Sequence, residues 1–249
     1  MTKFFKNIRK SLLNEGETSK YLKYAIGEII LVVIGILIAL QINNWKDYKK
    51  NRVEEQQILK NFKEDLETDK KLLDEFKEKA LSYSKSADTI LLSINEAVPF
   101  DPKKFIGHAS AIISNIYFES SSSTFDQSLS TGKIDLVENA ELRKELLEYY
   151  KLTKLNFDDK RISETNQNFV FPEVFSQIVA TKEVSEQLTG IATKLPQFDL
   201  HSLATNRAFS TWVILKKQAF REQSINYTEL SEKVMDLISK IDEEIERNN

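Results

Sequence analysis

Residues 29–40 read IILVVIGILIAL, an uninterrupted apolar run of twelve residues near the start of the 249-residue chain. A helix needs about 20 residues to cross a bilayer, and the flanks extend the run to Tyr24–Ile42, with Glu28 and Gln41 as its polar exceptions. Twelve apolar residues favour insertion by about 6 kcal/mol in total, and one off-centre carboxylate opposes it by less than about 3 kcal/mol. The sequence therefore predicts a transmembrane helix over residues 21–44.

Two other interpretations of this run are a buried helix of a soluble protein and a cleaved signal peptide. A soluble helix normally has a polar face, and the run shows none for three turns. A signal peptide needs small residues before its cleavage point. Ala39 is small, but Gln41 is a poor partner for it and Leu40 and Ile42 are bulky. An uncleaved single span fits the sequence better than either alternative.

Charge is distributed unevenly along the chain. Residues 1–53 hold ten Lys/Arg and four Asp/Glu, whereas the remaining residues hold 25 and 34, so the second part is acidic. Six basic residues precede the span and four follow it closely, which is a mild positive-inside bias. Because a short basic tail is harder to translocate than a long domain, we expect a cytoplasmic N-terminus and an extracytoplasmic C-terminal part.

The first 20 residues combine apolar and basic side chains at helical spacing. Phe4, Phe5, Ile8, Leu12 and Leu13 alternate with a set of membrane-surface basic residues, Lys3, Lys6, Arg9 and Lys10. This pattern predicts a basic amphipathic helix on the anionic inner leaflet, with membrane lipid as its partner. A disordered basic tail is the alternative.

Residues 36–98 contain neither Gly nor Pro, and apolar residues recur in them with a period of seven. One register is entirely apolar: Leu59, Leu66, Leu73, Ala80, Ala87 and Ile94. The companion register is Phe62, Asp69, Phe76, Tyr83 and Ile90, and we expect its polar exception, Asp69, to be locally solvated. The pattern predicts a long helix over residues 45–98 that packs as a coiled coil or bundle. The registers continue backward across Asn43 and Asn44, so one helix can leave the membrane unbroken unless it kinks there.

Residues 99–200 are predicted to form short helices and loops. Gly132 is expected to end a short helix in the left-handed conformation, residues 133–137 to form an extended connector, and Asn139 to cap the next helix. Residues 201–249 are predicted to form one long helix packing back on residues 45–98, with a stripe of Val213, Phe220, Tyr227, Val234 and Ile241. The predicted fold is all-α: one N-terminal transmembrane helix that continues into a long helix, with an extracytoplasmic antiparallel helical bundle.

Several segments together resemble a known family. They are FFKNIR at residues 4–9, SKYL at 19–22, YAIGE at 24–28, GILIALQINNW at 35–45, TFD at 124–126, STGKI at 130–134, LR at 142–143 and YY at 149–150. These segments are similar to an uncharacterised family of single-pass membrane proteins common in Bacteroidota, a domain of unknown function. The similarity is close over residues 1–50 and moderate over 120–150. The resemblance implies an inner-membrane protein of a Gram-negative cell with its bulk in the periplasm, and it brings no catalytic residue.

Few residues suit catalysis or metal binding. The chain has no Cys and two His, and neither His108 nor His201 has an acidic neighbour at ligand spacing. The sequence STGK at residues 130–133 lacks the leading Gly and trailing Ser/Thr of a phosphate loop, so helix capping explains it better. The acidic outer part disfavours nucleic acid as a partner. We therefore expect no cofactor and no enzymatic activity.

The apolar run has one candidate interface. Gly35 and Ala39 form a small-xxx-small pair that lets two helices approach closely, Glu28 lies seven residues before Gly35, and Gln41 can hydrogen-bond across such a contact. The sequence thus predicts a transmembrane interface of Glu28, Gly35, Ala39 and Gln41. The alternative is that Glu28 sits at headgroup depth beside Lys20 or Lys23 and only tunes insertion.

Two hypotheses of function follow. The first is an oligomeric, membrane-anchored periplasmic interaction or scaffold protein, whose partner is a second copy or another membrane or periplasmic protein. A continuous exposed apolar seam over Leu59–Ile94 would favour it. The second is a periplasmic sensor or small-ligand-binding domain with a pocket near residues 105–118 and 169–175. An apolar pocket with a few convergent polar groups would favour that hypothesis.

Overall fold

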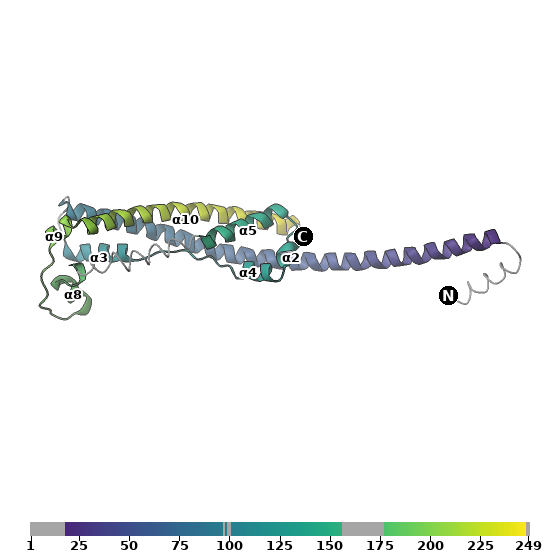
Figure 1. Ribbon diagram of the computed structural model, residues 1–249, viewed down its shortest axis with the longest axis horizontal. Coiled ribbons are helices and arrows are strands. Elements are labelled where there is room, and N and C mark those ends of the chain that lie inside the picture. Colours follow the sequence, from purple (N-terminus) through teal and green to yellow (C-terminus); the bar gives the residue numbers. More distant parts are fainter. Residues whose placement is uncertain (1–17, 97, 99–100, 156–176, 248–249) are drawn as a thin grey trace. The chain divides into compact units, whose positions relative to one another are not determined.

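The computed structural model describes residues 18–96, 98, 101–155 and 177–247, and these residues are helical or irregular with no strand (Figure 1). This confirms the all-α class. The chain divides into two compact units, Met1–Glu55 and Gln56–Asn249. The predicted amphipathic segment with Lys3, Lys6, Arg9 and Lys10 lies outside the described residues.

Helix α2 spans Thr18–Ile94 and passes from the first unit into the second as one helix. It has no break at Asn43 and Asn44. No Gly or Pro lies between Gly35 and Pro99. This explains the continuity, because Gly and Pro are the residues that destabilise the interior of a helix most. The long apolar N-terminal helix expected from the sequence is therefore present.

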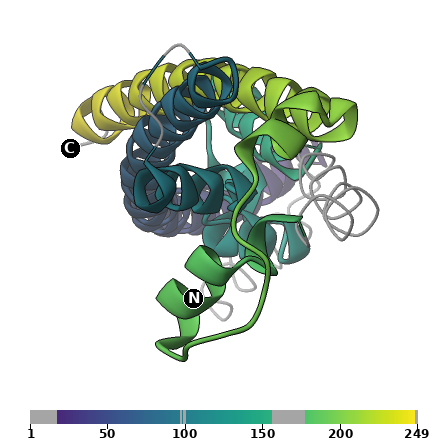
Figure 2. The same ribbon diagram turned by 90° about the vertical axis from the view of Figure 1, so that its left-hand side faces the viewer.

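In the second unit, helix α10 (Arg207–Arg247) lies antiparallel to the second half of α2 (Figure 1, Figure 2). Three polar pairs give the register: Lys63 with Asp242, Asp74 with Ser231, and Asp88 with Lys217. As the position on α2 rises from 63 to 88, its partner on α10 falls from 242 to 217. Between these pairs Phe76 contacts Tyr227 and Tyr83 contacts Phe220, so aromatic rings fill the space where the two stripes meet.

Both predicted stripes are buried. Leu59, Leu66, Leu73, Ala80 and Ala87 have no exposed surface, and Val213, Phe220, Tyr227, Val234 and Ile241 are also in the core. The seam of α2 is therefore covered within this chain. A continuous exposed seam, which would have favoured the first hypothesis of function, is not found.

Shorter helices complete the second unit. They are α3 (Pro102–Ile113), α4 (Ser123–Ser130), the 3-10 helix η1 (Lys133–Leu136), α5 (Ala140–Leu155), α8 (Lys182–Thr189) and α9 (Leu200–Thr205). Asn139 caps α5 by accepting from the backbone N–H groups of Glu141 and Leu142, as expected. Gly132 adopts the left-handed conformation at φ 69°, also as expected. The prediction of an extended connector at residues 133–137 is wrong. Gly132 is the N-cap residue of η1, so the 3-10 helix begins directly after it.

The C-terminal segment also differs from its prediction. It forms two helices, α9 and α10, and not one helix over residues 201–249. Asn206 leaves the helical conformation between them, with ψ at 103°, and its side-chain oxygen accepts from the backbone N–H of Phe209. A side-chain cap at Asn206 therefore starts α10 and separates it from α9.

Candidate functional site

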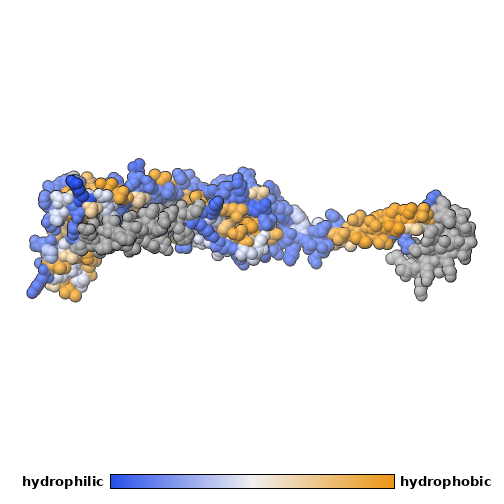
Figure 3. Space-filling model, viewed as in Figure 1, coloured by the Kyte–Doolittle hydropathy of each residue, from blue (hydrophilic) through white to orange (hydrophobic). Residues whose placement is uncertain are grey.

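The apolar segment, residues 25–42 of α2, is the most exposed hydrophobic surface among the described residues. Figure 3 shows it as an orange band, and none of its most apolar window is buried. By length and composition it can cross a membrane, and it is the one helix of the described residues that can. A signal sequence near an N-terminus passes the same test. A soluble core helix would have its apolar residues covered, and here they are open.

The predicted interface residues do not all share one face of this helix. With about 100° between successive residues, Glu28, Gly35 and Ala39 fall within an arc of about 40°. Gln41 lies about 140° from Glu28 on the same reckoning. An added Cβ at Gly35 would meet no atom within 4 Å, so this face is open in the single chain. A single contact with another helix can therefore include Glu28, Gly35 and Ala39. Gln41 lies on a different side of the helix.

A second candidate is a buried polar cluster in the second unit, at the place where α2, α4 and α5 meet. Its centre is Asp69, which has no exposed surface. One carboxylate oxygen accepts from the backbone N–H of Ser121 at 2.7 Å, and the other accepts from the Tyr149 hydroxyl at 2.7 Å. The expectation that Asp69 is locally solvated is therefore wrong. Its charge is met by protein donors that lie far away in sequence.

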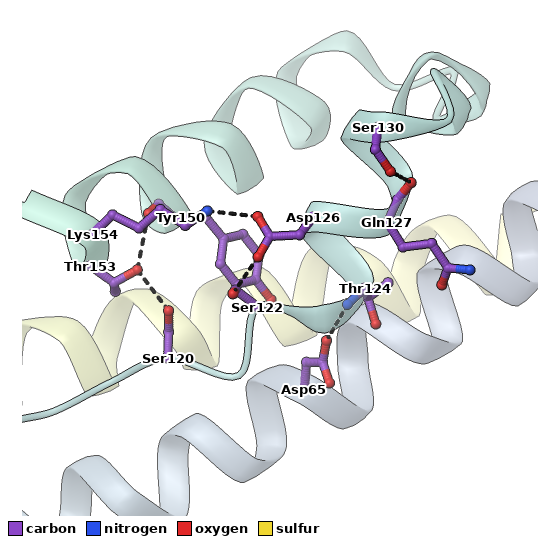
Figure 4. Close-up of polar contacts among 10 residues, drawn as sticks. All are labelled: Asp65, Ser120, Ser122, Thr124, Asp126, Gln127, Ser130, Tyr150, Thr153 and Lys154. Carbon is purple, nitrogen blue, oxygen red and sulfur yellow. Dashed lines mark hydrogen bonds and ion pairs between the residues drawn. The ribbon is translucent and has the colours of Figure 1, made fainter.

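Asp65, one turn before Asp69, holds the start of α4. Its Oδ2 accepts from the backbone N–H of Thr124 at 3.1 Å (Figure 4). The same oxygen lies 3.5 Å from the Ser123 hydroxyl. The residue at the N-cap position, Ser122, gives α4 no side-chain cap. A carboxylate from α2 thus takes the place of the missing cap, where the helix dipole favours negative charge.

Two residues of α5, Thr153 and Lys154, hold the start of α4 and the Ser-rich loop before it, residues 119–122, from the other side. The Lys154 ammonium donates to Asp126 at 2.6 Å and the Ser122 hydroxyl donates to it at 2.8 Å. The lysine, followed by the serine, holds the pKa of Asp126 below its usual range. The hydroxyls of Ser120 and Thr153 lie 2.9 Å apart (Figure 4). The Ser-rich loop is therefore fixed on both sides, by α2 and by α5.

Tyr150 fills the centre of this arrangement. Its ring stacks on Phe125 at 4.6 Å between centroids and also contacts Phe62. Its hydroxyl is buried and has no hydrogen-bond partner among the described residues. Most buried hydroxyls are paired, so an unpaired one is an exception that calls for an explanation.

Burial sets the protonation states in the cluster. Burial, with a smaller contribution from the Asp65 charge, raises the pKa of Asp69 above its ordinary value despite the two hydrogen bonds that lower it. Burial, with the Asp69 charge next in size, raises the pKa of both Tyr149 and Tyr150 far above the ordinary value. Both tyrosines are therefore neutral hydrogen-bond donors at physiological pH. The cluster holds a loop in place and leaves one buried donor, Tyr150, available.

Sequence reasoning did not assemble this cluster. Asp65 and Asp69 lie four residues apart and so on one helix face, which is a signal that could have drawn attention to them. Their partners come from residues 121–124 and 149, and no local pattern connects those positions. Of the two histidines, His108 lies 3.1 Å from the Ser86 hydroxyl. The described residues contain no group of three or more His, Asp or Glu side chains that could hold a metal ion.

Comparisons with known proteins give one match. No curated protein and no solved structure matches the chain. A model of a family of unknown function, DUF6090, matches residues 28–188, well over half of the chain. The matched region includes Glu28, Gly35 and Ala39 of the apolar segment, as well as the residues of the buried cluster. The chain therefore belongs to the DUF6090 family of unknown function.

Proposed function

We propose that the protein is a membrane-anchored, non-enzymatic interaction or scaffold protein of the bacterial inner membrane, and that it acts as an oligomer. The observation that carries the proposal is the apolar segment, whose most apolar window has none of its surface buried. Leaving this surface in water would be unfavourable by about 25 cal/mol for each Å². A bilayer covers the helix around its whole circumference and so removes this cost completely. A protein partner on one side of the helix would remove only part of it.

The proposed orientation places the N-terminus in the cytoplasm and residues 56–249 in the periplasm. It is supported by the six basic residues before the segment and by the difficulty of translocating a short basic tail. A reporter that is active only outside the cytoplasm, fused after Asn249, is expected to be active. Activity of a cytoplasm-only reporter at the same position would reverse the orientation.

Self-association is proposed to use the face formed by Glu28, Gly35 and Ala39. Lipid tails supply no hydrophobic drive between helices, so close backbone contact at small residues is what favours pairing. Glu28 lies on the same face, where a protonated carboxyl can donate across the contact and an ionised one needs a cation or headgroup. A second copy of the chain presents the complementary face by symmetry.

The test is association of the full chain in detergent or in a membrane two-hybrid assay. Gly35→Ile places a branched side chain in the contact and is expected to weaken association. Leu37→Phe adds bulk about 180° from Glu28 and is the matched control, expected to leave association unchanged. Equal association of the wild type and Gly35→Ile would leave the segment as a plain anchor.

A second candidate function, a periplasmic sensor or small-ligand-binding protein, has one observation in its favour. Part of the pocket expected near residues 105–118 and 169–175 lies outside the described residues, namely 169–175. The unpaired Tyr150 hydroxyl, however, is a buried donor, and the charges of Asp69, Asp65 and Asp126 act on it. If a water or ligand accepts from it, Tyr150→Phe is expected to destabilise the second unit. If nothing does, the loss of an unpaired hydroxyl is expected to be neutral or stabilising.

A further inference from the structure

We propose that residues 45–50, which we call the basic collar, bind anionic phospholipid headgroups of the leaflet at the C-terminal end of the apolar segment. The collar contains Trp45, Lys46, Tyr48, Lys49 and Lys50, all exposed. The inference rests on the proposed anchoring of residues 25–42 and adds to it a lipid class and a set of residues. Three properties of the collar indicate this partner: its distance from the end of the apolar segment, the positions of its lysines around the helix, and its net charge.

The depth of the collar matches the headgroup layer. The last apolar residue of the segment is Ile42, and the helix rises about 1.5 Å per residue. Trp45 and Lys46 then lie about 5–6 Å beyond the hydrocarbon, and Lys49 and Lys50 about 10–12 Å beyond it. A headgroup layer is about 5–8 Å thick on each side, and lysine side chains reach back toward it along their aliphatic stems. All three ammonium groups can therefore meet headgroup phosphates.

The arrangement gathers the lysines on one side of the helix. Taking Trp45 as reference, Lys49, Lys46 and Lys50 lie at about 40°, 100° and 140° around the axis, an arc of about 100°. The Lys49 ammonium sits over the Trp45 ring, 5.5 Å from its centroid, which orders one cation against an aromatic ring at interfacial depth. Trp and Tyr are the side chains that favour this layer.

The charge around the collar favours an anionic partner. Residues 45–50 hold three lysines and one acid, Asp47, so their net charge is +2. The Asp47 carboxylate accepts from the Asn43 side chain at 3.2 Å. Lys50 has one weak ion pair, to Glu54 at 3.9 Å, and its side chain is still 73% exposed. Each basic residue near an anionic surface strengthens binding by about fivefold.

The experiment uses the full chain reconstituted into vesicles of phosphatidylcholine with phosphatidylglycerol. Brominated lipids quench tryptophan on contact, so quenching of Trp45 reports which lipid touches the collar. Trp212, the second tryptophan, is only 6% exposed, and the variant Trp45→Phe supplies its background. The test variant replaces Lys46, Lys49 and Lys50 by Gln. The control replaces Lys60, Lys71 and Lys85, exposed lysines of α2 in the second unit, by Gln and makes the same change in net charge.

For the wild type, brominated phosphatidylglycerol is expected to quench Trp45 at least about fivefold more effectively than brominated phosphatidylcholine at equal mole fraction, because Lys49, over the Trp45 ring, alone contributes about that factor. The preference is expected to disappear in the collar variant and at 1 M salt, and to persist in the control. Equal quenching by both lipids in the wild type, or an unchanged preference in the collar variant, would overturn the collar. A chain that fails to float with vesicles of either composition would overturn the proposed anchor as well.

Discussion

Helix α2 contains two stretches, residues 25–42 and residues 56–94. Both are regular α-helix, but the second is packed against other elements and the first is not. Residues 25–42 are apolar on every face, and their most apolar window has none of its surface buried. Residues 56–94 are apolar on one stripe, and that stripe is buried against α10, α5 and the segments between them. The comparison shows that a helix with one apolar stripe buries that stripe within its own chain, whereas a helix that is apolar on every face leaves its apolar side chains exposed.

Each apolar surface is interrupted by one acidic residue, and these two residues also differ in what surrounds them. Asp69 interrupts the buried stripe, and the backbone of Ser121 and the hydroxyl of Tyr149 satisfy it. Glu28 interrupts the apolar segment and lies on the open face with Gly35 and Ala39. A buried carboxylate is retained only when donors meet it. The two acidic exceptions therefore lie in different surroundings, Asp69 in the protein core and Glu28 on a partly exposed position of an open apolar helix.

The largest effect is expected when leucine is shortened in each stretch. Leu66→Ala removes a side chain with no exposed surface, so it should lower the free energy of unfolding of the second unit by about 2–5 kcal/mol. Leu37→Ala lies in the apolar segment and should leave that free energy unchanged. Urea unfolding of the full chain in detergent, followed by Trp212 fluorescence, measures both. Equal destabilisation by the two changes would erase the distinction between the stretches.

The two acidic exceptions give the next largest difference. Asp69→Leu leaves the Ser121 N–H and the Tyr149 hydroxyl buried without an acceptor, which should destabilise the second unit by about 2 kcal/mol. Glu28→Leu should not alter the same unfolding transition. Should Asp69→Leu prove as stable as the wild type, the hydrogen bonds of Asp69 would be dispensable.

The pH dependence of Asp69 sharpens this point. Burial raises its folded-state pKa above the ordinary value, so protonation of Asp69 favours the folded state. The stability of the wild type relative to Asp69→Asn should therefore rise as the pH falls from neutral through the folded-state pKa, and level off below the ordinary pKa of an aspartic acid. Chemical denaturation at a series of pH values tests this. A relative stability that falls over the same range would show that the carboxylate is stabilised in its ionised form.

Lys216 is a cation inside the second unit, and removing its charge should have a smaller effect. Burial lowers the pKa of Lys216 to about 8, and its ammonium donates to the Asn115 side chain at 3.0 Å. Lys216→Met should stabilise the unit at pH 7 by about 1–2 kcal/mol, after allowance for partial exposure. The gain is fully present below pH 8 and should fade toward pH 10.5, where the unfolded lysine also loses its proton. Lys217→Met, which removes an exposed partner of Asp88, is the control and should change stability by less than about 0.5 kcal/mol.

The smallest expected difference compares two glycines. Gly132 has a φ of 69°, so Gly132→Ala should destabilise the second unit by about 1 kcal/mol. Gly35 is inside a helix and an added Cβ there meets nothing within 4 Å, so Gly35→Ala should leave the fold unchanged. Thermal unfolding followed by circular dichroism compares them. A loss of stability from Gly35→Ala equal to that from Gly132→Ala would indicate that the apolar segment is not a regular helix.

The predictable parts of the fold are those that local pattern determines. The seven-residue recurrence from Leu59 to Ile94 predicted which side of α2 is buried, and Asn139 and Gly132 follow from the chemistry of helix ends. The break at Asn206 was missed because the apolar stripe of the last helix was extended backward through it. A capping asparagine is difficult to tell from an ordinary helical one without its partner at Phe209.

The buried cluster could not be predicted, because its contacts join positions with no local relation. Asp69 meets donors 52 and 80 residues away, and Asp65 caps a helix 59 residues away. The candidate face of the apolar segment is the opposite case. Its three residues follow from helical periodicity alone, and the same periodicity separates Gln41 from them.

The central claim is that one helix passes from lipid into a protein core, and a cysteine scan along α2 tests it most directly. The chain has no Cys, so single cysteines at positions 25–94 can be labelled with a water-soluble maleimide in vesicles without background. We expect protection at every position from 26 to 42, on whichever face of the helix it lies. We expect periodic labelling from 56 to 94, with positions 59, 66 and 73 protected and positions 60, 67 and 71 labelled. Periodic labelling within 26–42 would contradict the claim, because that segment would then have one face in water.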